Sequence, residues 1–144
     1  MFDLPVKSVM NRKKFLTVAP ELSVAKAAQL MAKQNVGAVV VVSEGQLVGI
    51  FTERDAVFRV IAVGLDARVT PLSAVMTAAP KTVDAMRPFG FALYMMHENG
   101  FRHVPVMENG KPVGIVSSRK ALDPDLEEFV SEAERRRQYA SLAA

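Results

Sequence analysis

The sequence predicts an α+β fold built from two β-α-β-β-α repeats and a C-terminal helix. Gly45 to Asp55 returns sixty-five residues later as Gly110 to Lys120, with the glycines, apolar residues, hydroxyl and arginine in the same order. Both copies also show the same succession of short apolar runs and helical periodicities. A repeat of this length buries little core alone, so the copies are expected to pack together and leave a cleft between them.

The composition limits the kind of protein. The chain has 144 residues, half of them hydrophobic, which suits one compact domain made of two halves. It has no cysteine, which excludes disulfides, thiol nucleophiles and cysteine-ligated metals. The two histidines, His97 and His103, lack the i, i+4 spacing of a helical metal site. We therefore expect no metal.

Hydropathy and charge indicate the cellular location and the classes of partner. The longest apolar run, near Val36–Val42, is far shorter than the roughly 20 residues that span a bilayer, and the first residues do not resemble a signal peptide. We expect a cytoplasmic protein with no membrane partner. The net charge is +3, with basic clusters at Arg12–Lys14 and Arg135–Arg137. No groove-reading element accompanies them, so solvated ends are favoured over nucleic-acid binding, which is kept as a third hypothesis.

The first repeat, assigned to residues 5–64, begins with a strand and a helix. Leu16–Val18 is predicted as a short strand. Ser23 is the expected N-cap of a helix, because apolar residues recur after it at a period of 3.6. The apolar side of this helix is expected to comprise Val24, Ala27, Ala28 and Met31.

A hairpin and a second helix complete the first repeat. Gly37–Val42 is a continuous β-branched run, typical of a strand buried on both faces. Ser43–Gly45 predicts a turn, after which Gln46–Phe51 returns antiparallel. Thr52 is expected to begin a helix. Its predicted apolar stripe comprises Ala56, Val57, Val60 and Ile61.

The second repeat, assigned to residues 71–122, follows a connector at Gly64–Pro71. One residue is dropped near Val75–Met76, the counterpart of Val9–Met10, and the offset is otherwise constant. The expected elements are a strand at Thr82–Val83, a helix at Arg87–Asn99, and hairpin strands at Val104–Val106 and Val113–Val116.

Two residues of the second hairpin carry a specific expectation. Asn109-Gly110 predicts a tight turn in which both residues have positive φ. Pro105 has no N–H to donate, so its strand is expected to lie at a sheet edge or to leave that position unpaired.

Residues 123–144 form a predicted helical tail outside the repeat. Asp123-Pro124 is typical of an N-cap followed by proline at the first helical position. The apolar side of this helix either covers the body of the protein, which we favour, or offers a surface to a second chain. That side is expected to comprise Leu126, Phe129, Val130 and Ala133.

These features together resemble the cystathionine-β-synthase (CBS) domain, here as a tandem pair over about residues 5–122. The resemblance is carried by the duplication, the opening Val-Met, the apolar strand before a glycine turn, and Gly49-Ile50-Phe51-Thr52-x-x-Asp55. Arg102-His103-Val-Pro105-Val is similar to that family's second strand. The resemblance implies sheets packed about a pseudo-twofold axis, a cleft that binds an adenine nucleotide (AMP, ADP or ATP) as a regulatory signal, and a homodimer.

The motif has a physical interpretation of its own. The hydroxyl of Thr52 and the free N–H groups of a first helical turn suit a phosphate, and Arg54 can add a charge-assisted contact. The carboxylate of Asp55 can accept hydrogen bonds from both hydroxyls of a ribose. The same Thr-x-x-Asp pattern is also a capping box, which the helix needs whether or not anything binds, and both interpretations can hold together.

A slot for the base is expected beside this motif. Ala38, Val39 and Val40 are small or apolar, and the backbone of Thr17 and Val18 should lie next to them. By the resemblance, His103 faces the cleft and Pro105 lies in the same strand, so both are included among the candidate ligand-binding residues.

The two copies of the motif are not equivalent. Lys120 stands where the first copy has Asp55 and cannot accept a hydrogen bond from a ribose. Ser117 and Arg119 retain the hydroxyl and the arginine, which can still contact a phosphate or simply begin a solvated helix. We therefore expect one competent nucleoside site per chain, centred on Thr52 and Asp55.

The function that we predict is that of a non-enzymatic regulatory module. No nucleophile elbow, dinucleotide-binding glycine motif or Walker loop is present, and no tightly bound cofactor is expected. The alternative is a ligand-independent dimerisation or scaffold module. A client protein that responds to the module is expected, but nothing in the sequence identifies it.

Overall fold

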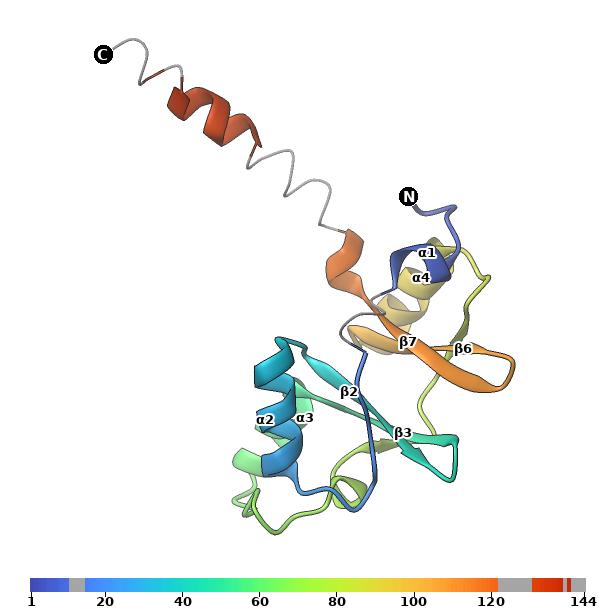
Figure 1. Cartoon of the computed structure of the whole chain (residues 1–144), viewed down its shortest axis with the longest axis vertical. Helices are drawn as coiled ribbons and strands as arrows, with labels where there is room; N and C mark the ends of the chain where they lie inside the picture. The colour runs from blue at the N-terminus through green and yellow to red at the C-terminus, as the bar shows by residue number, and fades with distance from the viewer. Residues whose placement is uncertain (11–14, 122–130, 139, 141–144) are drawn as a thin grey trace.

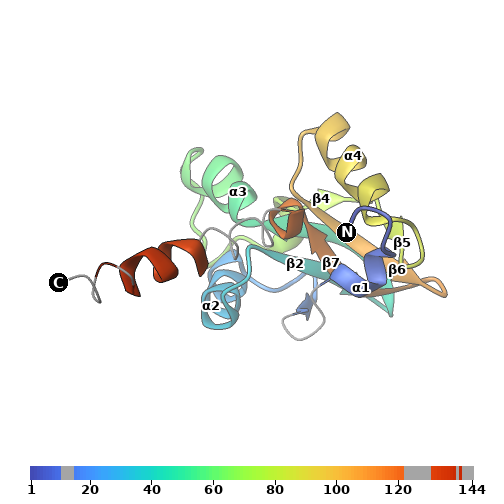
Figure 2. The same ribbon diagram turned by 90° about the horizontal axis from the view of Figure 1, so that it is seen from above.

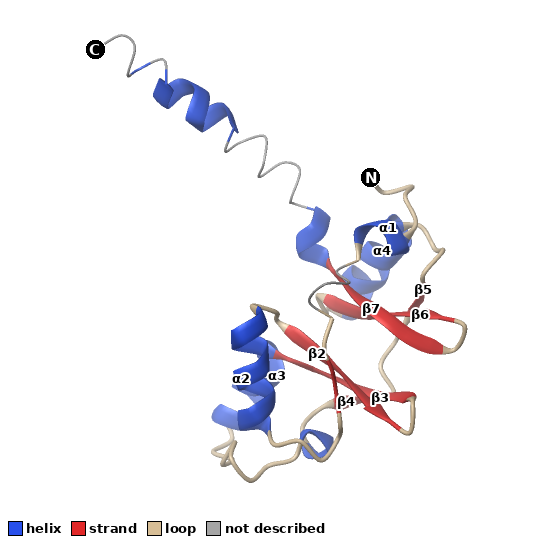
Figure 3. Ribbon diagram, in the orientation of Figure 1, coloured by secondary structure: helices blue, strands red, loops and turns tan. Residues whose placement is uncertain are grey.

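The computed structural model describes residues 1–10, 15–121, 131–138 and 140. Two small β-sheets, one centred on each repeat, lie next to one another in the body of the molecule (Figure 1). The first sheet has the strand order β1-β2-β3-β4 and the second has the order β5-β6-β7. Helices and strands are interspersed along the chain, as Figure 3 shows, which confirms the predicted α+β class.

The first sheet contains the predicted parallel strand and hairpin. β1 (Thr17–Val18) pairs parallel with β2 (Ala38–Ser43), and β3 (Gln46–Thr52) returns antiparallel. Helix α2 (Val24–Gln34) joins β1 to β2, and the side chain of its N-cap, Ser23, accepts a hydrogen bond from the Lys26 N–H at 3.2 Å. The predicted cap and apolar side are therefore present, except that Ala28 is exposed.

The second sheet repeats this arrangement with fewer strands. β5 (Val83–Asp84) pairs parallel with β6 (His103–Glu108), β7 (Lys111–Ser117) returns antiparallel, and α4 (Phe89–Asn99) joins β5 to β6. Asn109 and Gly110 have φ values of 54° and 76°, which confirms the predicted tight turn. β7 ends in a short 3₁₀ turn, η3 (Ser118–Ala121).

Each repeat donates its opening segment to the other. α1 (Val6–Val9) packs in the core beneath the second sheet, whereas η2 (Leu72–Ala74) packs beneath the first. β4 (Thr77–Ala78), which follows η2, extends the first sheet by pairing with β3. Because the exchange is reciprocal, the two halves are related by an approximate twofold axis.

The backbone hydrogen bonds of the two exchanged segments match one for one. Val6 N–H donates to the Arg87 carbonyl at 2.8 Å, and Leu72 N–H donates to the Leu22 carbonyl at 2.9 Å. Figure 2 shows α1 beside the second sheet, away from α2 and α3 of the first repeat. Neither half therefore has a complete core without a piece of the other.

The methionine that ends each exchanged segment packs against a glycine of the other repeat's motif. A Cβ placed on Gly114 would lie 2.7 Å from the Met10 sulfur, and one placed on Gly49 would overlap the Met76 side chain. The glycines that the two motif copies share therefore have a packing role, since any side chain there would displace the methionine.

The helix that begins after Thr52 differs from the prediction. α3 (Glu53–Asp55) runs directly into a π-helix, η1 (Ala56–Ile61), in which the Ala62 N–H bonds to the Val57 carbonyl five residues earlier. Val57 and Ile61 are 50% and 71% exposed, whereas Val60 is buried. The predicted apolar stripe is therefore confirmed for Val60 and for Ala56, which packs against the first core, and is wrong for Val57 and Ile61.

Pro105 lies in the central strand of the second sheet, so the expectation of an edge strand is wrong. The expectation of an unpaired position is confirmed on the β5 side. In the first sheet the ladder begins at Thr17 opposite Val40, whose N–H donates to the Leu16 carbonyl at 3.0 Å. In the second it begins one residue later, at Val83 opposite Val106, because Pro105 has no N–H to donate.

The C-terminal helix is described over residues 131–138. Its predicted start at Asp123-Pro124, and Leu126, Phe129 and Val130, lie outside the described residues. Ala133 and its neighbours in 131–138 are exposed, and Figure 1 shows this part standing apart from the two sheets. This part of the tail therefore does not cover the body, which corrects the favoured interpretation for Ala133.

We expect Gly49→Ala to lower the free energy of unfolding by about 1–3 kcal/mol, because the new methyl group overlaps the Met76 side chain. The measurement is urea unfolding of the single variants and of the double variant Gly49→Ala/Met76→Ala. The alanine should cost much less once Met76 is truncated. An equal cost in both backgrounds would show that the glycine is needed for another reason.

Candidate functional site

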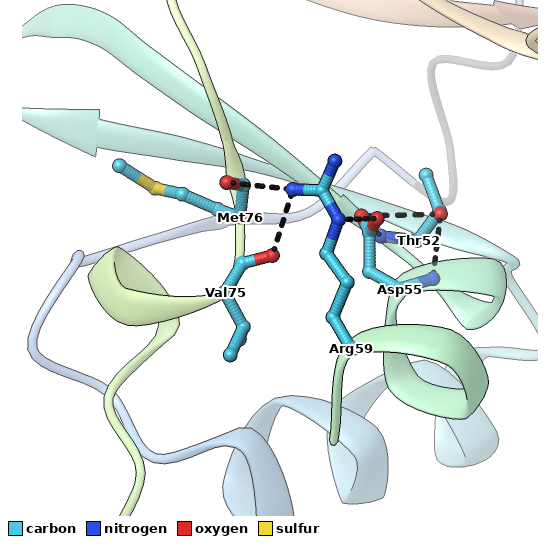
Figure 4. Close-up of polar contacts among 5 residues, drawn as sticks. All are labelled: Thr52, Asp55, Arg59, Val75 and Met76. Atoms are coloured by element: carbon cyan, nitrogen blue, oxygen red, sulfur yellow. Dashed lines mark hydrogen bonds and ion pairs between the residues drawn. The ribbon is translucent and has the colours of Figure 1, made fainter. Parts of the chain in front are cut away.

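The strand-to-helix junction at Thr52 forms a complete capping box (Figure 4). The Asp55 N–H donates to Thr52 Oγ1 at 3.3 Å, and the Thr52 N–H donates to Asp55 Oδ2 at 3.0 Å. The Thr52 hydroxyl also donates to Oδ2, at 3.2 Å. These bonds satisfy the N–H groups of Thr52 and Asp55, so the capping interpretation of the motif is present in the structure.

The other carboxylate oxygen of Asp55 faces an arginine on the next turn. Arg59 Nε lies 3.5 Å from Oδ1, and Arg59 Nη1 donates to the carbonyls of Val75 and Met76 at 3.3 and 3.2 Å (Figure 4). Asp55 is only 8% exposed. A carboxylate has about four acceptor positions, so Oδ1, with one long ion pair, retains acceptor capacity that Oδ2 has already used.

Alternating residues of β2 face two different environments. The side chains of Val39 and Val41 lie in the core with α2, whereas Ala38 and Val40, also buried, belong to the opposite face. β2 and β3 contact β7 of the second sheet, so this opposite face is the seam between the repeats. The structure therefore brings Ala38 and Val40 to the seam but turns the Val39 side chain away from it.

The other predicted slot residues lie around the same strand. Thr17 and Val18 are in register with Val40 and Val41, so their backbone is adjacent to β2 as predicted. On the second sheet, Pro105 is buried and His103 is half-buried.

Glu53 and Gly37 also belong to this region, although neither was predicted to lie at the site. A Cβ placed on Gly37 would lie 3.0 Å from Glu53 Oε1 and 3.3 Å from His103 Nε2. The Glu53 N–H donates to the Gly37 carbonyl at 2.9 Å, which holds the start of α3 against the start of β2. Glu53 occupies an unspecified position of Thr-x-x-Asp, and only the packing of the repeats places it near His103.

The environment of His103 disfavours its protonated form. Burial lowers the pKa of His103, and the positive charge of Arg102 lowers it further, whereas the negative charge of Glu53 opposes both. The neutral imidazole is therefore favoured at the junction of the two repeats.

The second copy of the motif has a different geometry. The Arg119 N–H donates to Ser117 Oγ at 3.2 Å, two residues apart, and η3 is a 3₁₀ turn. Lys120 follows on this exposed turn, at the place of Asp55. In the first copy, the Arg54 guanidinium lies at the surface, 4.4 Å from the centre of the Phe58 ring.

The described part of the chain has neither a cluster of metal-ligating side chains nor a membrane-spanning helix. No group of three or more His, Asp or Glu residues there could hold a metal ion. Within those residues, no helix has the length and apolar character needed to cross a bilayer.

Comparison with known proteins identifies relatives for most of the chain. A family model described as the CBS domain matches twice, at residues 6–62 and 72–124. The CBS domain-containing protein YhcV of Bacillus subtilis (strain 168) is 36% identical over 112 residues, covering 78% of this chain and 79% of that protein. The chain spans 18% and 64% of the lengths of two other curated relatives.

Solved structures share the fold. A putative signal-transduction protein with CBS domains from Burkholderia ambifaria MC40-6 is 29% identical, with a TM-score of 0.73 over 78% of this chain and 83% of that one. A CBS domain protein from Pyrobaculum aerophilum, solved in complex with AMP, is 26% identical, with a TM-score of 0.73 over 81% of this chain and 89% of that one.

The environment of His103 predicts how stability depends on pH. The folded-state pKa is below the ordinary value of 6.5, so the unfolded chain binds the proton more readily. The contribution of His103 to stability is present above pH 6.5 and is lost as the pH falls toward its folded-state pKa. Urea unfolding at about pH 7.5 and about pH 5.5 should show a smaller loss for His103→Gln than for the wild type.

His97→Gln is the matched control, because His97 is exposed on α4. This variant should retain the wild-type pH dependence. If His103→Gln loses as much stability as the wild type between the two pH values, then His103 does not carry the effect.

Proposed function

The chain belongs to the CBS domain family as a tandem pair, and from this premise we propose that it binds an adenine nucleotide at the seam between its repeats. It is a regulatory module of the CBS type. AMP, ADP and ATP are the proposed ligands, and the AMP complex of the Pyrobaculum aerophilum protein supports this choice.

The observation that carries the proposal is the position of Asp55. Its carboxylate lies at the end of β3, next to the strand that brings Ala38 and Val40 to the seam. Ala38 is in register with Thr52, so a base packed beside Ala38 would place its ribose near Asp55 Oδ1. The Thr52 hydroxyl and Arg54 are then the groups proposed to contact phosphate.

Regulation follows if the ligand distinguishes between arrangements of the repeats. The proposed contacts come from both halves, with Thr52 and Asp55 on one and His103 and Pro105 on the other. A nucleotide that binds one arrangement more tightly shifts the population toward it, whereas equal affinity would shift nothing. The response would be detected by a client protein that the chain itself does not identify.

A homodimer in the cytoplasm is the proposed working form. Large apolar side chains are exposed on η1 and α4, and Figure 2 shows α3, which continues into η1, and α4 on the same side of the sheets. Phe58, Ile61 and Tyr94 are 57%, 71% and 65% exposed. Exposed apolar residues from two helices on the same side of the sheets are typical of a surface that a second chain covers.

A second candidate function is a scaffold that binds no nucleotide. The capping box favours it, because the Thr52 hydroxyl and Asp55 Oδ2 already serve the start of the helix. The exposed apolar residues of η1 and α4 would serve such a module equally well. The two functions differ in one measurable property, which is the affinity for a nucleotide.

Isothermal titration calorimetry with AMP, ADP and ATP tests the proposal. The titration should give one site per chain. In a separate thermal-unfolding measurement, nucleotide at one hundred times its dissociation constant should stabilise the folded state by about 2.7 kcal/mol. Asp55→Asn should weaken binding by about ten- to a hundredfold, because the charged acceptor for the ribose is lost. Asp66→Asn is the matched control, since Asp66 is bonded to Arg68 away from the seam.

The same titration tests whether the two repeats differ in their affinity for nucleotide. Lys120→Asp restores an acceptor in the second copy and should add a second, weaker binding event. No heat and no thermal shift with any of the three nucleotides at millimolar concentration would favour the scaffold. Wild-type affinity in Asp55→Asn would show that nucleotide binds elsewhere.

A further inference from the structure

We propose that Arg59 couples the carboxylate of Asp55 to the segment that joins the two repeats. This inference rests on the proposed nucleotide site and assigns it a route for regulation. Arg59 is a positioning residue in this proposal, because it acts on the ligand through Asp55.

The geometry of one guanidinium group carries the inference. Arg59 extends from η1 with its Nε toward Asp55 Oδ1, at 3.5 Å, while its Nη1 is shared between the carbonyls of Val75 and Met76, at 3.3 and 3.2 Å (Figure 4). The planar fork of an arginine can hold a carboxylate and carbonyls at the same time, which an ammonium group cannot do in this geometry.

The two carbonyls belong to a segment whose position depends on both repeats. Val75 is buried in the first core, and Met76 lies over Gly49. Directly afterwards, Thr77 pairs with Ile50 as β4 begins. The chain then enters the second sheet at β5. A change in the hydrogen bonds to the Val75 and Met76 carbonyls would therefore act where the first repeat is joined to the second.

Ligand and arginine would share one oxygen. Asp55 Oδ2 is already occupied by the Thr52 N–H and hydroxyl, whereas Oδ1 receives only the ion pair with Arg59 among the contacts described. A ribose that donates to Oδ1 either displaces Arg59 Nε or draws it nearer. Either movement changes the hydrogen bonds from Nη1 to the Val75 and Met76 carbonyls. Binding at Asp55 is in this way transmitted to Val75 and Met76.

At the corresponding positions, the sequence of the second repeat has no equivalent pair of a carboxylate and an arginine. Sixty-five residues after Arg59 stands Pro124, which has no side-chain donor, just as Lys120 replaces Asp55. The carboxylate and the arginine that holds it therefore occur together in the first copy and are replaced together in the second.

Hydrogen exchange at two amides measures the coupling directly. The Met76 N–H bonds to the Leu72 carbonyl at 2.8 Å, and the Ala79 N–H bonds to the Val48 carbonyl at 3.2 Å, so both report on the segment. Exchange is measured by NMR in the ligand-free wild type, Asp55→Asn, Arg59→Met and the double variant. Ala85, whose N–H bonds to the Met107 carbonyl in the second sheet, is the internal reference.

Without ligand, Asp55→Asn should speed exchange at Met76 and Ala79 by about two- to five-fold, the range expected for loss of a half-exposed ion pair. Once Arg59 is methionine, Asp55→Asn should add nothing further at these amides. Arg68→Met, which removes an arginine bound to Asp66, should leave both amides unchanged. Arg59→Lys should give the same exchange rates as Arg59→Met. It takes the place of Arg59→Met in the cycle if the methionine variant does not fold.

AMP provides the second arm of the experiment. In the wild type it should change exchange at Met76 and Ala79, and in Arg59→Met it should still bind without changing them. An equal effect of Asp55→Asn with and without Arg59 would overturn the coupling. If AMP fails to bind the wild type, the proposed function fails, while the ligand-free cycle still decides whether Arg59 links Asp55 to the segment.

Discussion

The structure depends on the reciprocal exchange of two short segments. α1 completes the core of the second repeat, and η2 with Val75 completes the core of the first. The methionine at the end of each segment then lies over a glycine of the other repeat's β-hairpin. Separation of the halves would expose both cores at once, so the seam between the sheets is maintained by the same contacts that stabilise each half.

This exchange also determines what the candidate site can do. The segment that Arg59 holds at Val75 and Met76 is one of the two exchanged pieces, so the polar contacts of Asp55 extend to the element that joins the repeats. On the other side of the seam, His103 lies beside Gly37 and Glu53 of the first repeat. A ligand at this seam would contact groups whose positions depend on both halves, which is the requirement for a sensor rather than a passive pocket.

Local patterns in the sequence were sufficient for most elements, but not for the exchange of segments between the repeats. The repeat, the hairpin at Asn109-Gly110, the Ser23 cap and the Thr52 capping box depend on neighbouring residues, and each is present. The exchange was not predicted because an opening Val-Met fits either sheet equally well. The π-turn was missed because the prediction assumed the 3.6-residue period of an α-helix. The contacts of Arg59 with Val75 and Met76 were missed because they join residues 16 and 17 positions apart. The roles of Asp55 and its neighbours toward a ligand remain predictions.

The most direct test of this account is whether the two halves unfold as one unit. Methyl NMR can follow Val39 and Val41 in the first core and Val104 and Val106 in the second through a urea titration. The exchange predicts that all four lose their native signals with one midpoint and one slope, because each core contains a segment of the other repeat. Separate midpoints for the two pairs would contradict it, since each half would then be stable without the segment it receives.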